Sequence, residues 1–316
     1  MKDIKKLVKR DKFIWLLWSI AVVIFVGNML FAFYKNVEEG FVQLYTWKAE
    51  QPEIFEIFEM GSISEELFCI YSVKYVWLNV LVWVVTIGIL VFQDIKWFVR
   101  EKRGGSEFQK LLPVKEKNMF VYELAVGILA ILIPVVLFWC GSQMLLAMWN
   151  QKYIDMLTFI QCGPLSLPMS TWGIWAPSLI DGILVYALYI FTKYATNHLA
   201  GHSFTFGMFM LSGFMVYATA PLDIGRVNLR PWIGIAGIVI LVILAYICNQ
   251  KKDLSASGFF AFRSVQYVTM LLVFINLILI FWESGSGYHM VVRVLYTAVL
   301  SVLITVGANY VMKPKY

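Results

Sequence analysis

REKRGGSEFQKLLPVKEKN, the stretch Arg100–Asn118, is a charged island between two long apolar runs. Ser106 followed by Gln109 is a capping-box pattern, which predicts the start of a short helix here. Pro113 disfavours continuation of that helix beyond its first few turns. The apolar side chains of the predicted helix fall on one face at the spacing i, i+3, i+4: Phe108, Leu111 and Leu112. The island therefore predicts a discrete amphipathic helix between two spans.

The apolar runs around the island decide the class of protein. Hydrophobic residues make up 60% of the 316 residues and charged residues 15%, whereas soluble domains are about 45–50% apolar. The runs recur at roughly 20 residues, the length of a membrane-spanning helix, and not at the roughly 10 residues of a β-barrel strand. The sequence predicts an all-α, polytopic membrane protein with a single transmembrane domain over residues 1–316.

We predict about eight transmembrane helices, each near the length that a bilayer requires. They cover residues 13–33, 75–92, 118–141, 179–194, 204–220, 232–248, 265–282 and 290–312. A basic arm, 1–12, precedes the first span, which is too long for the apolar part of a signal peptide. Most Lys and Arg residues fall in the arm, the 94–118 loop and other segments on the same side. The positive-inside tendency therefore predicts two cytoplasmic termini and a multi-pass protein of the cell (cytoplasmic) membrane.

The net charge of +6 is explained by this distribution and is not interpreted as a nucleic-acid-binding surface. This distribution of charge predicts membrane lipids as partners. Cys69 and Cys162 both fall in segments predicted outside, so a disulfide between them and two free thiols are both open interpretations.

The longest polar segment, 35–74, is acidic and predicted to be extracytoplasmic. Pro52 is placed to open a short helix within it. Two interpretations remain open for that helix: a contact site for a cationic or amphipathic substrate, or a solvated cap held at the interface. Its acidic and apolar side chains would lie along opposite sides, and the candidate contact residues are Glu53, Phe55, Glu56, Phe58 and Glu59.

Ionisable residues near the membrane form the other candidates. Asp181 and Arg293 are predicted near the outer ends of two spans. Two interpretations are open for them: a structural ion pair, or a gate or substrate contact. Glu123 lies one turn inside the third span, where it would snorkel or tie the island to a neighbouring helix through Arg263 or a Lys of the amino-terminal arm. Of the two, we expect snorkelling. His198 and His202 are four residues apart, but without a Glu between them or a third ligand they predict polar residues of a short cytoplasmic turn and no metal site.

The island resembles the cytoplasmic loop of the permease (transmembrane) subunit of an ABC-2 type transporter. The resemblance rests on the basic arm, the sizeable outer loop after the first span, and the run 107–114, EFQKLLPV, followed by 115–120. Members of this family carry a coupling helix there. The resemblance assigns docking on an ATPase subunit to Glu107, Phe108, Lys110, Leu111, Leu112 and Pro113, and it implies a core of six spans plus re-entrant elements.

The resemblance also implies the partners and the function of the protein. The partners would be ATPase subunits that bind ATP and Mg, together with a second permease as a homodimer or heterodimer. This chain has no phosphate-loop motif and would bind no cofactor itself. Its function would be ATP-driven export or removal of an amphipathic substrate: an antimicrobial peptide, or a lipid-linked or cell-wall-related compound.

Two other classes of function stay open. A polytopic membrane enzyme acting on lipid or peptide would need a cluster of nucleophile, base or metal ligands, and the sequence shows no convincing one. The chain itself is therefore not expected to be an enzyme. A non-transporting scaffold or sensor subunit would use the island to hold a cytoplasmic partner.

Overall fold

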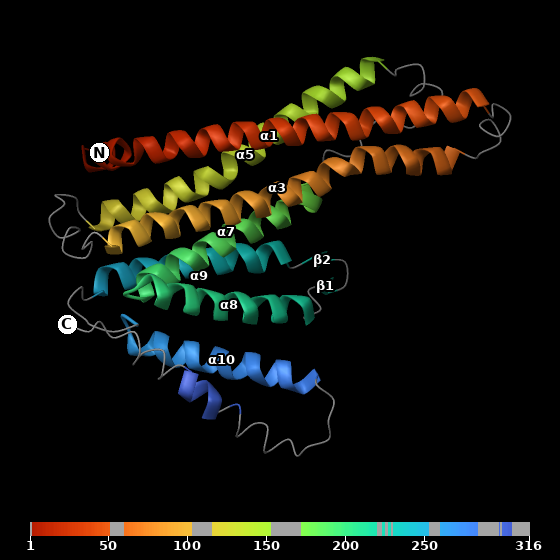
Figure 1. Ribbon diagram of the computed structural model, residues 1–316. Coiled ribbons are helices and arrows are strands. Elements are labelled where there is room, and N and C mark those ends of the chain that lie inside the picture. Colours follow the sequence, from red (N-terminus) through yellow and green to blue (C-terminus); the bar gives the residue numbers. More distant parts are fainter. Residues whose placement is uncertain are drawn as a thin grey trace. The chain divides into compact units, whose positions relative to one another are not determined.

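The protein is helical over nearly all the residues that its computed structural model describes (Figure 1). These residues are 2–50, 60–102, 116–152, 172–219, 223–224, 227–228, 230–252, 260–283, 297 and 299–304. The helices are α1 (Lys2–Glu50), α3 (Met60–Lys102), α5 (Glu116–Lys152), α7 (Trp172–Ala195), α8 (Leu199–Thr219), α9 (Arg230–Lys251) and α10 (Arg263–Glu283). Between α8 and α9, β1 (Asp223–Ile224) pairs antiparallel with β2 (Val227–Asn228).

The chain divides into two compact units. Unit 1 contains Met1–Ile4, Leu90–Val126 and Ile183–Tyr316, and unit 2 contains Lys5–Ile89 and Gly127–Gly182. Four helices contribute one part to each unit: α3, α5 and α7, and α1, of which only Lys2–Ile4 belong to unit 1. The island and the helix ends next to it therefore belong to the same unit as the second half of the chain.

Five helices of the described part are long and apolar enough to cross a membrane, which confirms the predicted class. They are Asp11–Gly40, Val76–Val99, Lys117–Trp149, Pro177–Ala195 and Pro231–Lys251. Helices α8 and α10 also cover two of the predicted spans but are not among these five. The last predicted span, 290–312, lies mostly outside the described residues. The count of eight spans and the cytoplasmic side of the termini stay predictions.

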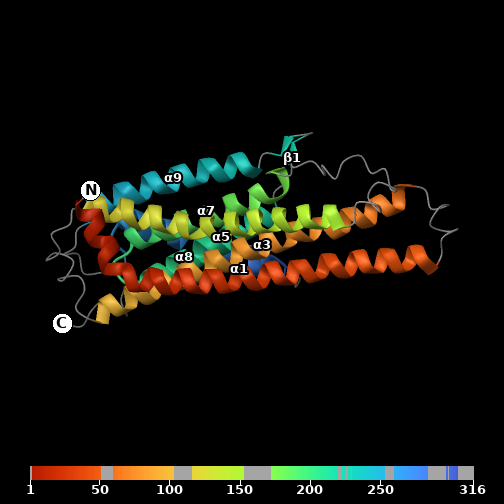
Figure 2. The ribbon, with the colours of Figure 1, turned by 90° about the horizontal axis from the view of Figure 1, so that it is seen from above.

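Several helices are longer than the predicted spans. Helix α1 continues through the first part of the acidic segment to Glu50, and α3 already begins at Met60 (Figure 2). Helix α5 passes through Gly141 and ends at Lys152, where the sequence predicts mixed interfacial structure. Hydropathy marks only the part of a helix that crosses the hydrocarbon core, and nothing in these extensions stops a helix. Pro52 follows α1 closely, where a helix is expected to end.

The core of unit 2 is aromatic where α1 meets α5. Phe33 and Phe138 are both fully buried, with ring centroids 6.1 Å apart in an edge-to-face arrangement. Trp149 packs against Phe33 at 5.7 Å and stacks on Tyr34 at 5.4 Å. Rings of this size supply much of the apolar contact area between two helices.

Helix α7 approaches α3 closely at Gly182 in the same unit. A methyl group added there would lie 2.7 Å from Val82 Cγ1 and 2.8 Å from Thr86 Oγ1. Small residues at such crossings let two membrane helices pack backbone to backbone.

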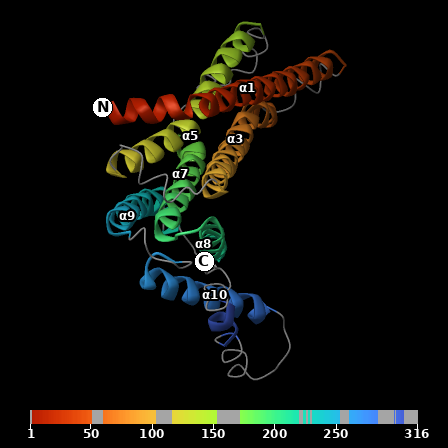
Figure 3. The same cartoon turned by 60° about the vertical axis from the view of Figure 1, so that its left-hand side comes forward.

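In unit 1, polar side chains join α8 and α10, which lie beside each other in Figure 3. Ser212 Oγ donates to Asn276 Oδ1 at 3.0 Å, and Asn276 Nδ2 donates to the carbonyl of Met208 at 3.3 Å. Buried polar groups at membrane depth have no water to bond, so they are satisfied by the neighbouring helix.

Candidate functional site: a buried polar network beside the island

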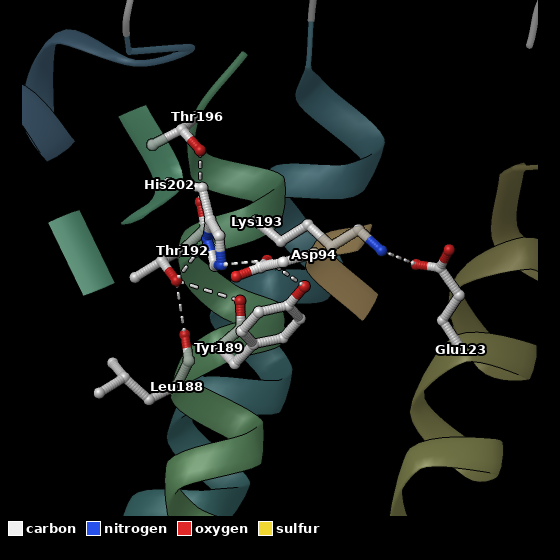
Figure 4. A network of polar contacts seen from close by, with 8 residues as sticks. All are labelled: Asp94, Glu123, Leu188, Tyr189, Thr192, Lys193, Thr196 and His202. Atoms are coloured by element: carbon white, nitrogen blue, oxygen red, sulfur yellow. Dashed lines mark hydrogen bonds and ion pairs between the residues drawn. The ribbon is translucent and has the colours of Figure 1, made fainter. Parts of the chain in front are cut away.

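Several charged, polar and aromatic side chains of unit 1 form a network near the end of α3 and the start of α5, the two helix ends that bound the island in the chain (Figure 4). The last turns of α3, the first turns of α5, the last turns of α7 and the first turn of α8 contribute to it. The network has two linked parts. One joins Asp94, Tyr189 and His202, and the other joins Glu123 with Lys193.

The first part ties α3 to α7. Tyr189 Oη donates a hydrogen bond of 2.8 Å to Asp94 Oδ1. Tyr189 is 1% exposed, whereas the Asp94 side chain is 37% exposed and can reach water. The sequence places Asp94 at the start of a loop, but α3 continues through it to Lys102. The carboxylate is thus held in place by a rigid, buried phenol.

His202 packs into the same part from α8. Its ring meets the Tyr189 ring edge-on with centroids 4.4 Å apart, and it lies beside Trp97 at 5.2 Å. Nδ1 is 3.0 Å from Thr192 Oγ1. Nε2 has no hydrogen-bond partner and lies 3.7 Å from Asp94 Oδ1, which is too long for a hydrogen bond.

The His202 ring is neutral. Its burial, and then the positive charge of Lys193, lower the pKa of His202 from 6.5 to about 3. The contact with Asp94 is therefore not an ion pair near neutral pH. The sequence-based expectation of a polar residue on a cytoplasmic turn is wrong for His202, which is 1% exposed, because aromatic rings of α3 and α7 enclose it.

The second part ties α5 to α7. Lys193 Nζ donates to Glu123 Oε2 at 2.8 Å, and Tyr194 Oη donates to the same oxygen at 3.0 Å. Tyr186 Oη donates to the main-chain carbonyl of Glu123 at 2.8 Å. The Lys193 ammonium also lies over the Trp97 ring, 5.8 Å from its centroid. A buried ion pair with further hydrogen bonds of this kind holds two helices in one register.

The snorkelling expected of Glu123 is wrong. The side chain of Glu123 is 1% exposed, and the side chain of Lys193 is 11% exposed. A carboxylate removed from water requires a cation and hydrogen-bond donors around it, and α7 supplies both.

The carboxyl end of α7 is joined to later parts of unit 1. Lys252 Nζ donates to the main-chain carbonyl of Thr196. The amide of Ala261 donates to the carbonyl of Ala195 at 3.0 Å, next to an antiparallel bridge between Thr196 and Phe260. Carbonyls at a helix end lack partners within the helix, and a cation there is favourable. The network thus reaches from α3 to the segment before α10.

Most residues singled out from the sequence lie outside the described part of the chain. This holds for the docking residues Glu107, Phe108, Lys110, Leu111, Leu112 and Pro113, for Glu53, Phe55, Glu56, Phe58 and Glu59, and for Arg293 and Cys162. Asp181 is described and lies partly buried in α7. The docking site, the outer contact and the Asp181–Arg293 pair therefore stay predictions.

The network can bind and position charge, and no metal-ligand cluster accompanies it. Among the described residues, no group of three or more His, Cys, Asp or Glu side chains is placed to hold a metal ion. The sequence itself carries a signal for the network. Asp94, Glu123, Lys193 and His202 all fall near the predicted cytoplasmic ends of spans, and polar groups at one depth tend to pair. No family model, curated protein or solved structure matches this chain.

Proposed function

We propose that the chain is the transmembrane subunit of an ATP-driven ABC exporter. In this proposal, separate ATPase subunits bind ATP and Mg and dock on the island. The permease, paired with a second copy or a sister chain, moves an amphipathic substrate out of or away from the membrane. Candidate substrates are antimicrobial peptides and lipid-linked or cell-wall-related compounds. The chain supplies the route and the coupling, and the partner supplies the hydrolysis.

The observation that carries the proposal is the position of the polar network next to the island. The island is bounded by the end of α3 and the start of α5. Both ends are tied to α7, one through the Tyr189–Asp94 hydrogen bond and the other through the Lys193–Glu123 ion pair. A force applied to the island by a partner would therefore be passed to α7 and, through the contacts of His202, to α8. Such coupling through packed, hydrogen-bonded elements is what an ATP-driven subunit needs.

The chemistry of the island supports a protein partner. Its apolar face, with Phe108, Leu111 and Leu112, fits the mode in which an amphipathic helix enters an apolar groove. The surrounding Lys and Glu residues would form the polar rim of such a contact. A scaffold or sensor subunit would use the same contact, so the response of the partner separates the two functions.

The first test is association with a phosphate-loop ATPase encoded in the neighbouring open reading frame. The two chains are co-expressed, the permease is purified through an affinity tag in mild detergent, and the bound ATPase is quantified. We expect a stoichiometric complex that the double substitution Phe108→Ala, Leu111→Ala abolishes while membrane insertion stays normal.

Lys117→Ala is the matched control, because Lys117 is an exposed residue in the first turn of α5. It should leave the ATPase bound. Unchanged association in the double variant would rule out the island as the docking site. A complete lack of association with the native chain, combined with activity on lipid or peptide, would favour the membrane enzyme.

A further inference from the structure

The contact between Asp94 and His202 places two hydrogen-bond acceptors opposite each other. Thr192 Oγ1 lies 3.0 Å from the main-chain carbonyls of both Leu188 and Tyr189, so its single proton is directed to the helix backbone. Thr192 Oγ1 therefore accepts from Nδ1–H of His202, which lies 3.0 Å away. In this tautomer Nε2 carries a lone pair.

That lone pair points into the site without a donor. Nε2 is buried, and the nearest polar atom is Asp94 Oδ1 at 3.7 Å. This oxygen already accepts from Tyr189. A buried acceptor without a donor is destabilising, and a carboxylate facing it adds repulsion. A proton between the two atoms would remove both penalties.

We propose that Asp94 and His202 bind one exchangeable proton between them. The proton comes from water and reaches the site through the exposed part of the Asp94 side chain. It binds to the carboxylate, and the new O–H donates to Nε2 of His202. The carboxylate becomes a neutral acid and the imidazole stays neutral. The site rests on the geometry of the network and does not depend on the proposed transport function.

The titratable and charged groups around the pair come from α5, from α7 and from the residue that follows α9. They are Glu123 of α5, Tyr189 and Lys193 of α7, and Lys252 after α9. Glu123 is neutralised by Lys193. Lys193 and Lys252 both disfavour a positive charge on the His202 ring. The bound proton is therefore expected on the oxygen side of the pair.

Proton binding would change how α3 is held. Without the proton, Asp94 is bonded to α7 through Tyr189. With it, Asp94 is bonded to both α7 and α8, and the O–N distance should contract to about 2.7 Å, the usual length of such a bond. The site would thus connect pH to the attachment of α3 beside the island.

The test combines infrared and nuclear magnetic resonance measurements on the purified full chain in lipid nanodiscs, in a buffer with a chelator so that protons are the ligand. The pH is lowered from about 8 to about 4, because the group that binds the proton is an aspartate, and aspartates ordinarily titrate at about pH 3.9. We expect a carboxylic acid C=O band that titrates as one proton and is lost in Asp94→Asn. In protein labelled with ¹⁵N at its three histidines, Nε2 of His202 should become a hydrogen-bonded acceptor while the ring stays neutral.

The controls separate the pair from its surroundings. His202→Gln should shift the titration of the band, whereas His198→Gln, four residues earlier, should leave it unchanged. A band that persists in Asp94→Asn, or an imidazolium signal from His202 in this interval, would overturn the proposal. If Asp94→Asn does not fold, the proposal is tested by the ¹⁵N spectrum of the native chain alone. An Nε2 signal of His202 that stays unchanged across the titration would refute the shared proton.

Discussion

Glu123 and Lys193 are 70 residues apart in the chain, yet their charged atoms meet at 2.8 Å. Neither residue alone is unusual near the end of a membrane helix. The contact matters because Glu123 is enclosed by hydroxyl groups of Tyr186 and Tyr194 from the same helix as its cation. Helix α5 thus supplies the carboxylate, and α7 supplies the cation and the hydroxyl donors that allow this carboxylate to be buried. These contacts fix the register of α5 on α7.

Glu123→Gln should therefore destabilise the protein strongly. The substitution leaves the ammonium of Lys193 largely buried without its counter-charge, and breaking such a pair costs about 3–5 kcal/mol. We expect a loss near about 3 kcal/mol, since the Trp97 ring still faces the ammonium. Denaturant unfolding in detergent measures this loss, and Glu39→Gln, at an exposed carboxylate of α1, should cost almost nothing.

The second variant of this pair tests whether the two residues act together. Lys193→Met added to Glu123→Gln removes the orphaned cation, so the double variant should be more stable than Glu123→Gln alone. Losses that simply add would show that the pair does not act as a unit.

The sequence predicted some of these residues and missed others for physical reasons. Local patterns identify which residues are ionisable and at what depth they lie, so Glu123, His198 and His202 were candidates. They do not show which residues meet across helices, and Tyr189 and Lys193 read as ordinary residues of an apolar span. The sequence predicts a loop at Asp94, because a charge usually ends an apolar run. Asp94 lies within α3 instead and accepts a hydrogen bond from Tyr189 of α7.

At the scale of elements, close helix packing depends on a few small residues. Gly182 allows α7 to lie against α3, where the nearest side-chain atoms would be 2.7 and 2.8 Å from an added methyl group. Val82 is β-branched and cannot rotate away easily. Gly27 of α1, in contrast, has nothing within 4 Å of the same position.

Gly182→Val should therefore destabilise the protein by about 1–3 kcal/mol through overpacking. The matched substitution Gly27→Ala should be neutral or stabilise α1 by up to about 1 kcal/mol, because alanine has the higher helix propensity. Thermal unfolding of the purified variants in one detergent compares them. Equal stability of Gly182→Val and the native chain would contradict the close packing at this crossing.

Hydropathy located the elements well and their ends poorly. Five predicted spans coincide with helices able to cross a membrane, because hydrocarbon thickness sets the length of an apolar run. The extensions to Glu50 and Lys152 lie beyond that thickness and carry polar residues. A helix continues there because its backbone bonds remain satisfied, and hydropathy does not report on this.

At the scale of the whole molecule, the predicted topology places the island and the amino terminus on the cytoplasmic side. Exposed helix positions near the predicted membrane surfaces allow a direct test by cysteine labelling in a variant without the four native cysteines. Glu50→Cys and Gln151→Cys should react with a membrane-impermeant maleimide in intact cells. Lys12→Cys and Lys117→Cys should react only after permeabilisation. Labelling of Lys117→Cys from outside would reverse the topology and place the island away from any cytoplasmic ATPase.

The proposed transport function depends on features at all three scales. The ion pair fixes the helices, the helices flank the island, and the island is the part that a partner would grip. ATP hydrolysis must then depend on this chain and on a substrate within the membrane, and not merely on a bound partner.

The most direct measurement is the ATP hydrolysis rate of the purified complex of this chain with the neighbouring ATPase, reconstituted in lipid. A cationic amphipathic peptide and a lipid-linked cell-wall precursor serve as probes. We predict that hydrolysis by the complex changes when a probe of the transported class is added and that Phe108→Ala, Leu111→Ala abolishes this response. A bound ATPase whose hydrolysis is the same with and without this chain, and with every probe, would contradict the account.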